Sequence, residues 1–567
     1  MSIPVAPEGG TPLSMIGPDF PFPYDLFRAH PAGIGAVPAE ALGTQVAVIG
    51  GGLSGVIVAR ELTRMGLRPV LYEPDRIGGR MRSASFDGHP GAVAELGAMR
   101  FPPSSTALFG YFDEAGVGTV PFPNPLAPST PDTVIDLKGV TVHGRSLDDL
   151  PPVFGRVARG WEAALEAGAG LGALRSAIRA RDAAAVAALW HPLVERYDDT
   201  TFYRFLVDSA QLRSFADREL FGQVGFGTGG WDTDFSNSIL EVLRVVATAA
   251  DEDHRGVVGG AQQVPVRLWS AAVPGAAHWP AGTSPASLNG GRPRPAAVEM
   301  RRTHPHRITV TDAGGGIADY PAVVYTAPLW LLLSTVKCDE SLFAAEHWSA
   351  IERTHYMGSS KVFVLVDRPF WRELDTSTGY PRMSMTLTDR MPRGVYLFDG
   401  PLAGSGEPES SDGPAVICLS YTWADDSLKL IPLDASERMD LMLDSLSSIY
   451  PDLDIRSHVI APPLTISWEV ERNFMGAFRA NLPGHYRYQE RLFTHFVQEG
   501  FAPGHRGVFL AGDDVAWTAG WAEGAVQTAL NAVWGVMHHL GGRCDRRNPG
   551  PGDRFAELAP IRLPDVT

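Results

Sequence analysis

A glycine-rich turn between two short apolar runs restricts the fold of this chain more than any other feature. Residues 45–50 (QVAVIG) form an apolar run of the kind that a buried parallel strand requires. Apolar residues then recur at helical spacing over 53–65, and 69–72 forms a second short apolar run. Strand, helix and strand follow one another within a short stretch, which predicts a βαβ unit.

The turn reads Gly50-Gly51-Gly52-Leu53-Ser54-Gly55, a G-x-G-x-x-G pattern. In this pattern Gly50 allows the tight turn, Gly52 lets the backbone approach a pyrophosphate, and Gly55 lets the helix pack closely on the strand. The helix N-terminus then offers free N–H groups to a phosphate. Glu73 follows the second run at the distance expected of a carboxylate that binds ribose hydroxyls, which disfavours NADP.

Two later segments favour FAD over NAD. Residues 77–83 (IGGRMRS) place Gly79 and Arg80 where a phosphate would lie. Residues 509–514 (FLAGDD) end an apolar run in Gly-Asp, which can bring a carboxylate to the ribityl hydroxyls, and a helix that begins near Ala522 can direct its N-terminus at a flavin ring. The GGR segment and the late GD resemble the amine-oxidase group of FAD flavoproteins, so we expect FAD and not a nicotinamide dehydrogenase.

Composition and charge exclude several other classes of protein. The net charge is −16, so nucleic acid and anionic membranes are poor partners. Three widely spaced cysteines make neither a disulfide framework nor a zinc site, which fits a reducing compartment. The N-terminus lacks the pattern of a signal peptide, and the apolar stretches are too short to span a bilayer. We expect a soluble, cytoplasmic protein without a membrane partner.

A metal site is not expected either. The close histidine pairs are His304 with His306 and His538 with His539, and neither pair has a third ligand nearby in the sequence.

The predicted fold class is α/β, with a split Rossmann-like FAD-binding domain, a mixed-sheet substrate domain and a helical insertion. The insertion is expected because leucines recur at helical spacing over the Ala- and Arg-rich residues 152–220. The predicted units are an N-terminal arm at 1–43, the FAD-binding domain at 44–105, 255–325 and 503–542, the substrate-binding domain at 106–144, 223–254 and 326–502, a helical subdomain at 145–222 and a C-terminal tail at 543–567.

Several segments narrow the resemblance, because they occur in the same order and at the same spacing as in one group of this family. They are IGPDFPFPYD (16–25), AELGAMRFP (94–102), FGQVGFGTGGWDTDFSNS (221–238), MSMTLTDR (383–390), VICLSYTWADD (416–426), LPGHYRYQ (482–489) and AGDDVAWTAGWAEGAVQTALNAVWG (511–535). With them the chain resembles the bacterial L-lysine 2-monooxygenases of the flavin monoamine oxidase family. Members oxidise an L-amino acid with FAD and then use O2 to decarboxylate it to an amide. Related members act on tryptophan, phenylalanine or arginine, and some release the 2-oxo acid, ammonia and H2O2.

The resemblance implies roles for residues that would contact the substrate. Arg100 is the candidate clamp for the substrate carboxylate, because its forked guanidinium matches a carboxylate in bidentate fashion. Tyr421 resembles the second carboxylate donor. Trp423 and Trp521 resemble the aromatic walls that hold the Cα–H over the flavin, and Phe478 is a further candidate wall.

A lysine inside an apolar strand points to the oxygen step. Lys361, in MGSSKVFV, is costly to bury unless it has a partner. The resemblance implies that it holds a water against flavin N5 and stabilises charge when O2 reacts. The residues expected to bind the flavin are Gly50, Gly52, Leu53, Ser54, Gly55, Glu73, Gly79, Arg80, Met99, Arg100, Val298, Gly512, Asp513, Trp521 and Ala522.

Substrate selection is expected in the GWDTDF segment. A buried ammonium or guanidinium needs a compensating carboxylate, and Asp232 and Asp234 are the available pair. Asp234 resembles the contact to the lysine side chain; Asp232 is the alternative, and one of the two could cap the following helix. Position 250 holds Ala where the lysine monooxygenases have Cys, which leaves the ratio of oxidase to monooxygenase activity open.

The expected function is therefore FAD-dependent conversion of L-lysine and O2 to 5-aminopentanamide, CO2 and water, in a homodimer as relatives suggest. An L-arginine 2-monooxygenase and a basic L-amino-acid oxidase are alternatives on the same scaffold. A flavin-binding interaction protein without turnover is an alternative of another class, and the set of Arg100, Lys361 and Tyr421 argues against it.

Overall fold

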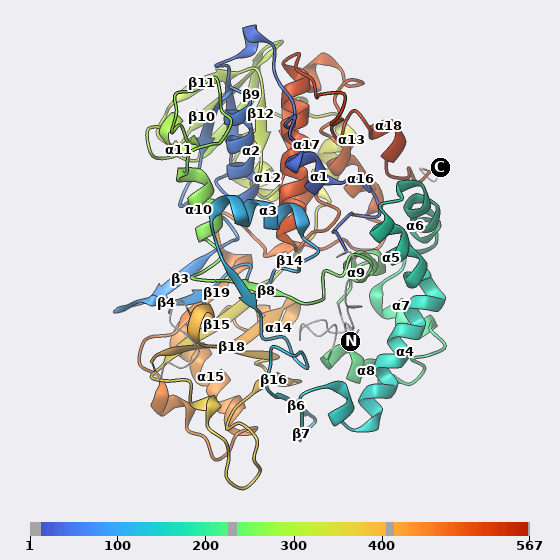
Figure 1. Cartoon of the computed structure of the whole chain (residues 1–567), viewed down its shortest axis with the longest axis vertical. Coiled ribbons are helices and arrows are strands. Elements are labelled where there is room, and N and C mark those ends of the chain that lie inside the picture. The colour runs from blue at the N-terminus through green and yellow to red at the C-terminus, as the bar shows by residue number, and fades with distance from the viewer. Residues whose placement is uncertain (1–12, 225–234, 404–412, 565–567) are drawn as a thin grey trace.

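The computed structural model describes residues 13–224, 235–403 and 413–564. A parallel sheet with its helices lies at one end of the long axis and a seven-stranded sheet lies at the other (Figure 1). A group of helices from the first half of the chain flanks both (Figure 1). The predicted α/β fold with a parallel sheet, a mixed sheet and a helical insertion is confirmed.

Four parallel strands from distant parts of the chain form the first sheet, in the order β2-β1-β12-β21. Their bounds are β1 Gln45–Ile49, β2 Arg68–Tyr72, β12 Val323–Tyr325 and β21 Val508–Leu510. Side chains alternate between the two faces, and both faces are covered, which explains why these strands read as continuous apolar runs. The predicted βαβ unit is confirmed.

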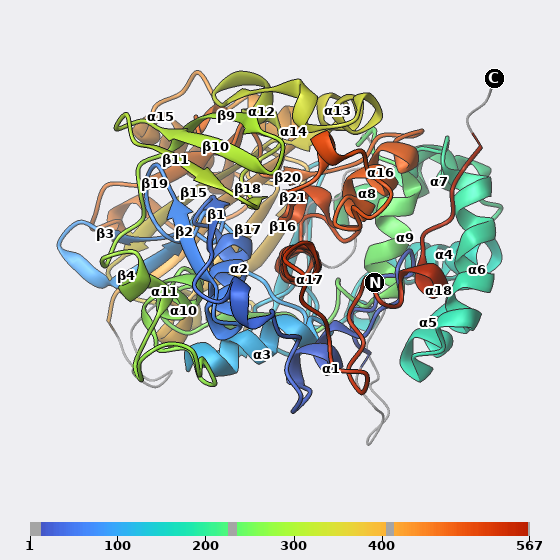
Figure 2. The ribbon, with the colours of Figure 1, turned by 90° about the horizontal axis from the view of Figure 1, so that it is seen from above.

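Each face of this sheet packs on a different layer. Val46 and Val48 point to the helices α2 (Leu53–Arg64) and α17 (Ala522–His539). Ala47 and Ile49 point to the other side, where a second four-stranded sheet of order β11-β10-β9-β13 lies. Figure 2 shows this sheet and α2 on opposite sides of β1 and β2. The strands of the second sheet are β9 Ala297–His304, β10 Arg307–Asp312, β11 Ile317–Tyr320 and β13 Lys337–Cys338.

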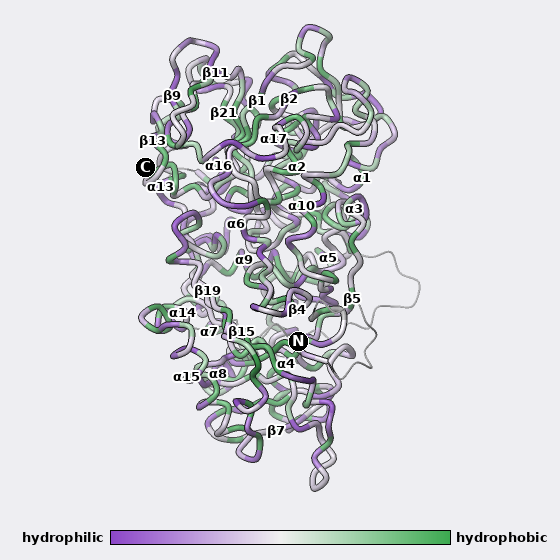
Figure 3. Tube along the Cα trace, turned by 90° about the vertical axis from the view of Figure 1, so that its left-hand side faces the viewer, coloured by the Kyte–Doolittle hydropathy of each residue, from purple (hydrophilic) through white to green (hydrophobic). Residues whose placement is uncertain are grey.

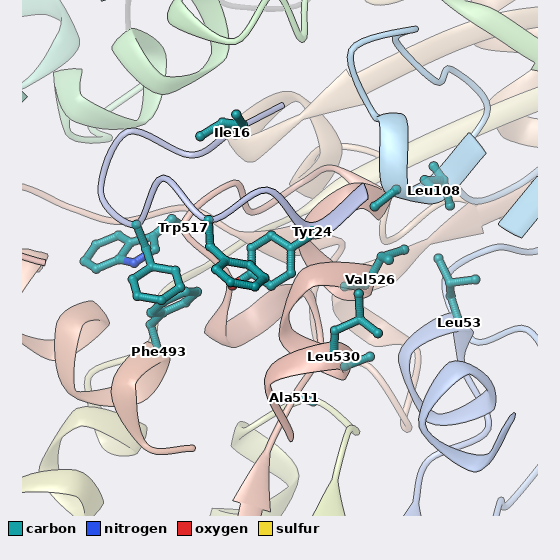
Figure 4. Close-up of a cluster of buried hydrophobic side chains, with 14 of the residues drawn as sticks. Ile16, Tyr24, Leu53, Leu108, Phe493, Ala511, Trp517, Val526 and Leu530 are labelled. Atoms are coloured by element: carbon teal, nitrogen blue, oxygen red, sulfur yellow. The ribbon is translucent and has the colours of Figure 1, made fainter. Parts of the chain in front are cut away.

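The N-terminal segment packs into the body of the protein. The hydroxyl of Tyr24 donates to Asn531 Oδ1 of α17 at 2.8 Å, and Gln527 Nε2 donates to the carbonyl of Met15 at 2.8 Å. Figure 4 shows Ile16 and Tyr24 in the buried cluster that includes Val526 of α17. The arm therefore becomes part of the core around α17.

The second large sheet has the order β19-β15-β18-β17-β16-β6-β7 and is antiparallel except for the parallel pair β16 and β6. The helix α15 (Ala435–Ser447) packs on β15 and β18. Its strands are β6 Thr133–Leu137, β7 Val140–Gly144, β15 Ser359–Val366, β16 Met385–Thr388, β17 Gly394–Phe398, β18 Ala415–Trp423 and β19 Leu464–Ser467.

Short two-stranded sheets and further helices connect these layers. The paired short strands are β3 Ser83–Phe86 with β4 His89–Glu95, β5 Thr119–Pro121 with β8 Arg255–Val257, and β14 Tyr356–Met357 with β20 Phe478–Arg479. The helical group comprises α4 Pro152–Ala169, α5 Leu171–Ala180, α6 Ala183–Tyr197, α7 Phe202–Asp208, α8 Phe215–Val224 and α9 Ile239–Ala247. The remaining helices are α1 Tyr24–Ala29, α3 Thr106–Ala115, α10 Gln263–Ser270, α11 Pro285–Leu288, α12 Trp330–Ser334, α13 Ala345–Glu352, α14 Ala424–Leu428, α16 Tyr486–Thr494 and α18 Phe555–Leu558.

Hydrophobic stretches follow the buried strands, whereas many outer loops are hydrophilic (Figure 3). Over the described part of the chain, the helices lack the combination of length and apolar character needed to cross a lipid bilayer. The exact limits given above for the separate units stay predictions.

Candidate active site

A cavity of about 290 Å³ is lined by residues of both the parallel sheet region and the seven-stranded sheet. The glycine-rich turn after β1 and the end of β2 contribute one part of the lining. Strands β15 and β18, the helix α9 and the segment that precedes α17 contribute another part. The cavity therefore joins the predicted dinucleotide site to the predicted substrate site.

Backbone geometry explains the glycines of the first part. Gly50 has φ +110°, and a Cβ there would lie 2.6 Å from Thr326 Oγ1. Gly79 has φ +59°, and its Cβ would lie 2.9 Å from the Cα of Gly52. Gly52 is the N-cap of α2 and supplies no capping side chain, so the first N–H groups of the helix stay available to an anion. These residues fit the pyrophosphate of a dinucleotide.

Glu73 reaches back from the end of β2 to the glycine-rich turn. Its Oε2 accepts a hydrogen bond from the Gly51 N–H at 2.6 Å, and its Oε1 accepts one from the Asp75 N–H at 3.0 Å. Burial raises the pKa of the Glu73 carboxyl above its ordinary value, while these hydrogen bonds oppose the shift. Glu73 also lines the cavity, as a residue that contacts ribose hydroxyls must.

The Arg80 guanidinium is held by carboxylates of the late Gly-Asp segment. Its Nη2 donates to Asp514 Oδ1 at 2.9 Å and its Nη1 to Asp513 Oδ2 at 3.3 Å. The Gly520 N–H donates to the other oxygen of Asp513 at 2.7 Å. Burial raises the pKa of Asp513 to about 6 in spite of the nearby arginine. Arg80 thus ties two predicted flavin-binding segments together at the cavity wall.

Most of the other residues predicted to bind the flavin also line the cavity. Gly55 lies behind the turn, where a Cβ would approach the Gly50 carbonyl to 1.9 Å, so its role is close packing of α2. Ala296 and Ala297 are among the described lining residues and Val298 is not. The remaining predicted residues in the lining are Leu53, Ser54, Met99, Arg100, Gly512, Trp521 and Ala522.

The pairing of β15 with β18 sets the second part of the site. Lys361 lies opposite Tyr421, and Ser359 opposite Trp423, so these side chains share one face of the sheet. Lys361 Nζ donates to the carbonyls of Glu95 at 3.0 Å and Gly97 at 2.5 Å, and it lies 4.7 Å from the centre of the Tyr421 ring.

These contacts compensate the buried lysine only in part. Burial lowers the pKa of Lys361 from 10.5 to about 8, and the positive charge of Arg100 acts in the same direction. Lys361 is therefore still protonated at neutral pH, but it titrates close to that range. A cationic group whose pKa lies only slightly above neutral pH suits a site where negative charge develops during a reaction.

Arg100 lies between aromatic rings at the same end of the cavity. Its Nη1 donates to the Tyr396 hydroxyl at 3.2 Å. Its guanidinium carbon lies 5.5 Å from the ring centre of Tyr421, 5.6 Å from that of Tyr396 and 5.7 Å from that of Phe122. The rings fix the guanidinium beside Lys361 and Tyr421, where it can bind a carboxylate.

Aromatic side chains form the rest of this lining. The Trp423 ring lies edge-on to Tyr421 at 5.2 Å and to Phe478 at 5.7 Å. Trp521 lines the cavity immediately before α17 and stacks on the imidazole of His254 at 5.5 Å. The structure therefore brings together the predicted residues Arg100, Lys361, Tyr421, Trp423, Phe478 and Trp521 around one cavity.

Sequence reasoning missed the contribution of α9 to the lining. Glu241 and Arg244 of α9 line the cavity, together with Asn237 just before the helix and Thr248 at its C-cap. Arg244 bonds to Glu241 at 2.6 Å and to Asp19 at 2.7 Å, and all three are buried. The signal was present in the sequence, because charged residues inside an otherwise apolar helix must be paired when the helix is buried.

The acids predicted to select the substrate side chain, Asp232 and Asp234, lie outside the described residues. Within the part of the chain that the structure describes, the carboxylates in the lining are Glu73, Glu241 and Asp513. Each already accepts a hydrogen bond from a named donor. The predicted contact of Asp232 or Asp234 with a cationic side chain therefore stays a prediction.

The glycine cradle fits a dinucleotide, and it opens into a cavity that contains Arg100 and the buried Lys361. This combination is that of a flavin-dependent oxidoreductase. The chain belongs to the family of flavin-containing amine oxidoreductases, whose model matches residues 53–537. FAD is its cofactor. It is an oxidoreductase of amines or amino acids, in the class that includes the 2-monooxygenases.

Several tryptophan 2-monooxygenases are similar to most of this chain. The protein from Agrobacterium vitis is 31% identical over 566 residues, which covers 94% of this chain and 71% of the relative. The protein from Pseudomonas savastanoi is 31% identical over 552 residues, with 91% and 93% covered. An L-amino-acid oxidase from Mus musculus is 25% identical over 503 residues, with 88% and 71% covered.

Solved structures confirm the fold. An engineered putrescine oxidase superimposes with a TM-score of 0.64 at 19% identity, covering 87% of this chain and 99% of the other. Cyclohexylamine oxidase from Brevibacterium oxydans IH-35A has a TM-score of 0.62 at 18% identity, with 88% and 100% covered.

Proposed function

We propose that this chain is an FAD-dependent L-amino-acid 2-monooxygenase whose substrate is L-lysine. It would convert L-lysine and O2 to 5-aminopentanamide, CO2 and water. The observation that carries the proposal is the convergence of Arg100, Lys361 and Tyr421 on the cavity that also reaches the glycine cradle. An amino acid held by its carboxylate at Arg100 would lie beside the aromatic walls.

Each group has a defined task in this proposal. The guanidinium of Arg100 binds the substrate carboxylate, and the Tyr421 hydroxyl is the second donor. FAD, when bound, supplies the oxidant for the Cα–H bond and delivers the electrons to O2. Lys361 holds its proton at Nζ beside Tyr421 and stabilises negative charge during the oxygen step.

The aromatic walls favour the amide over the oxo acid. The rings of Trp423, Phe478 and Trp521 line the cavity, and in this proposal they limit the access of water to the reacting end. Water would hydrolyse the imino acid to the 2-oxo acid and ammonia, whereas retention of the imino acid beside H2O2 leads to decarboxylation. The access of water past these rings therefore decides whether the same residues act as a monooxygenase or as a basic L-amino-acid oxidase.

Two features support the choice of lysine. They are the acids of the GWDTDF segment and the fact that the carboxylates in the described lining already have partners. Because Glu241 is already paired with Arg244, Asp232 and Asp234 are the acids left to receive a substrate cation. Asp234 is assigned the contact with the side-chain ammonium, and Asp232 is the alternative. The same reasoning fits L-arginine and L-ornithine.

A tryptophan 2-monooxygenase is the second candidate. The relatives from Agrobacterium vitis and Pseudomonas savastanoi carry that name. The aromatic rings of Trp423, Phe478 and Trp521 could also hold an indole by edge-to-face contacts.

The test is anaerobic mixing of the purified, FAD-loaded protein with L-lysine, L-arginine, L-ornithine, L-tryptophan and L-phenylalanine, with D-lysine as the control. Bleaching of the flavin reports oxidation of the amino acid, and mass spectrometry of aerobic mixtures separates the amide from the 2-oxo acid. We expect the fastest bleaching with L-lysine and a predominant amide.

Each other outcome has a defined meaning. A preference for tryptophan would replace lysine by the second candidate, and a predominant oxo acid would make the protein an oxidase. Absence of bleaching with every L-amino acid would leave the flavin-binding protein without turnover.

A further inference from the structure

The indole of Trp521 is held from behind by a residue that does not itself line the cavity in the described structure. Trp521 lines the cavity, and the imidazole of His254 stacks on it with 5.5 Å between ring centres and 28° between planes. His254 is 2% exposed and is not among the described lining residues. Its ring therefore contacts the indole of Trp521 from within the protein interior.

Two hydrogen bonds fix the orientation of this imidazole. Nε2 lies 2.8 Å from the carbonyl of Ala250, so it must carry the proton and donate. Nδ1 is then an acceptor, and Asn124 Nδ2 donates to it at 2.9 Å. With both nitrogens engaged, the ring cannot rotate without leaving a buried polar atom unpaired.

The backbone around His254 is held in an unusual conformation. Ala249 and Asp253 both have positive φ, +52° and +49°, although neither is a glycine. Such residues persist only where the surrounding structure enforces them, and they concentrate at functional sites. Here they bound the turn that presents the Ala250 carbonyl to His254.

Trp521 also packs against an apolar cluster that includes Ala250 of this turn. Met15, Val245 and Ala250 form a small buried cluster on which Trp521 packs. The indole thus packs against this apolar cluster in addition to the imidazole.

The backbone also connects His254 to the segment that carries Arg100. The next residue, Arg255, exchanges two backbone hydrogen bonds of 2.9 Å with Phe101, and Phe101 follows Arg100. His254 and Arg100 each lie one residue before a partner of this backbone bridge. This bridge links the segment of the proposed carboxylate clamp to the residue that stacks on Trp521.

We infer that His254 is a positioning residue that fixes the Trp521 indole relative to Arg100 and thereby sets the size of substrate that the cavity selects. The inference rests on the proposed function, because it takes Arg100 as the clamp for the carboxylate. Burial and the nearby Arg100 lower the pKa of His254 to about 3, so the imidazole stays neutral while it performs this task.

The experiment compares His254→Ala and His254→Gln with the wild type, all loaded with FAD. The measured quantity is the ratio of kcat/KM for the preferred L-amino acid to kcat/KM for the homologue shorter by one methylene. Both substitutions remove the flat ring behind Trp521, and we expect the ratio to change about tenfold or more, with a rise in KM. His254→Phe keeps a flat ring at this place without the two hydrogen bonds, and we expect it to change the ratio less than His254→Ala does.

A double-mutant cycle separates positioning from general damage. If His254 acts through Trp521, then His254→Gln causes no further change of the ratio in a Trp521→Ala background. His347→Ala is the matched control, because His347 is also a buried histidine but packs against His495 and Phe501 outside the cavity lining. We expect the control to lose stability without a change of the ratio.

Binding of propanoate, butanoate, pentanoate and hexanoate, read from the flavin spectrum, gives a result that does not require turnover. A wild type that oxidises no L-amino acid would refute the proposed function, and the chain-length dependence of carboxylate binding would still test His254. An unchanged ratio and unchanged length dependence in folded, flavin-loaded His254→Gln would overturn the inference. An equal effect of His254→Gln with and without Trp521 would overturn it as well.

Discussion

Replacing Lys361 by methionine should make the protein more stable at neutral pH and less reactive with oxygen. Lys361 is 2% exposed, and burial lowers its pKa from 10.5 to about 8. In the unfolded chain this lysine keeps its ordinary pKa, so the unfolded state binds the proton more tightly. Each pKa unit corresponds to about 1.4 kcal/mol, so burial of the ammonium costs roughly 3 kcal/mol of folding free energy below pH 8.

The pH dependence gives the sign. Between pH 8 and 10.5 the folded lysine is neutral while the unfolded lysine is still charged, so the stability of the wild type rises with pH. Above this window the cost has disappeared. Methionine has a similar length and no charge, so the advantage of Lys361→Met is largest near pH 7 and declines by roughly 3 kcal/mol across the window.

The assay is urea unfolding of the FAD-saturated wild type and variant at pH 7 and at successive values up to pH 10.5. Lys429→Met is the control, because its ammonium lies at the surface in an ion pair with Asp426 and should change stability by less than about 1 kcal/mol at any pH. A difference between wild type and Lys361→Met that stays constant with pH would refute the reasoning.

Lys361→Met should raise stability but lower catalytic activity. If the ammonium stabilises charge in the oxygen step, its removal should slow reaction of the reduced enzyme with O2 by about a hundredfold. Reduction of the flavin by the amino acid should change much less. Stopped-flow measurement of the two half-reactions decides this. If the variant keeps the wild-type rate in both, Lys361 has no role in the oxygen step.

Three further substitutions test the remaining parts of the site. Arg100→Lys keeps a charge but loses the fork, and it should lower kcat/KM about ten- to a hundredfold with unchanged FAD content; unaltered kinetics would exclude Arg100 as the clamp. Asp234→Ala should abolish turnover of L-lysine but spare L-phenylalanine, whereas the same swap in Asp232→Ala would move the assignment by two positions. Gly79→Ala should release FAD on dialysis, because its Cβ would lie 2.9 Å from the Cα of Gly52 and its φ is +59°; full retention of flavin would contradict the cradle.

Local sequence patterns were sufficient for the dinucleotide half. The spacing of glycines, apolar runs and Glu73 within one βαβ unit predicted β1, α2 and β2, which the structure confirms. These signals are local because a tight turn, a helix start and a buried strand each constrain residues that are neighbours in sequence. The late Gly-Asp segment extended the same logic to the flavin.

The substrate half was predicted by residue type and by family resemblance, not by its contacts. Lys361 is a candidate because a lysine in an apolar strand needs a partner, yet no local pattern indicates that the carbonyls of Glu95 and Gly97 supply it. The register of β15 and β18, which places Lys361 opposite Tyr421, depends on pairing across a long intervening segment. Such pairing has no local signature.

The sequence by itself determined the cofactor class and the βαβ unit, because these follow from short motifs, and it supplied the candidate site residues, whose roles stay predictions. Only the tertiary structure decided what holds those residues. It brought Asp19 of the N-terminal arm to Arg244 of α9, and it placed His254 behind Trp521. The physical reason is that a buried charge or ring is fixed by partners from distant segments, and these meet only after the two large sheets have packed together.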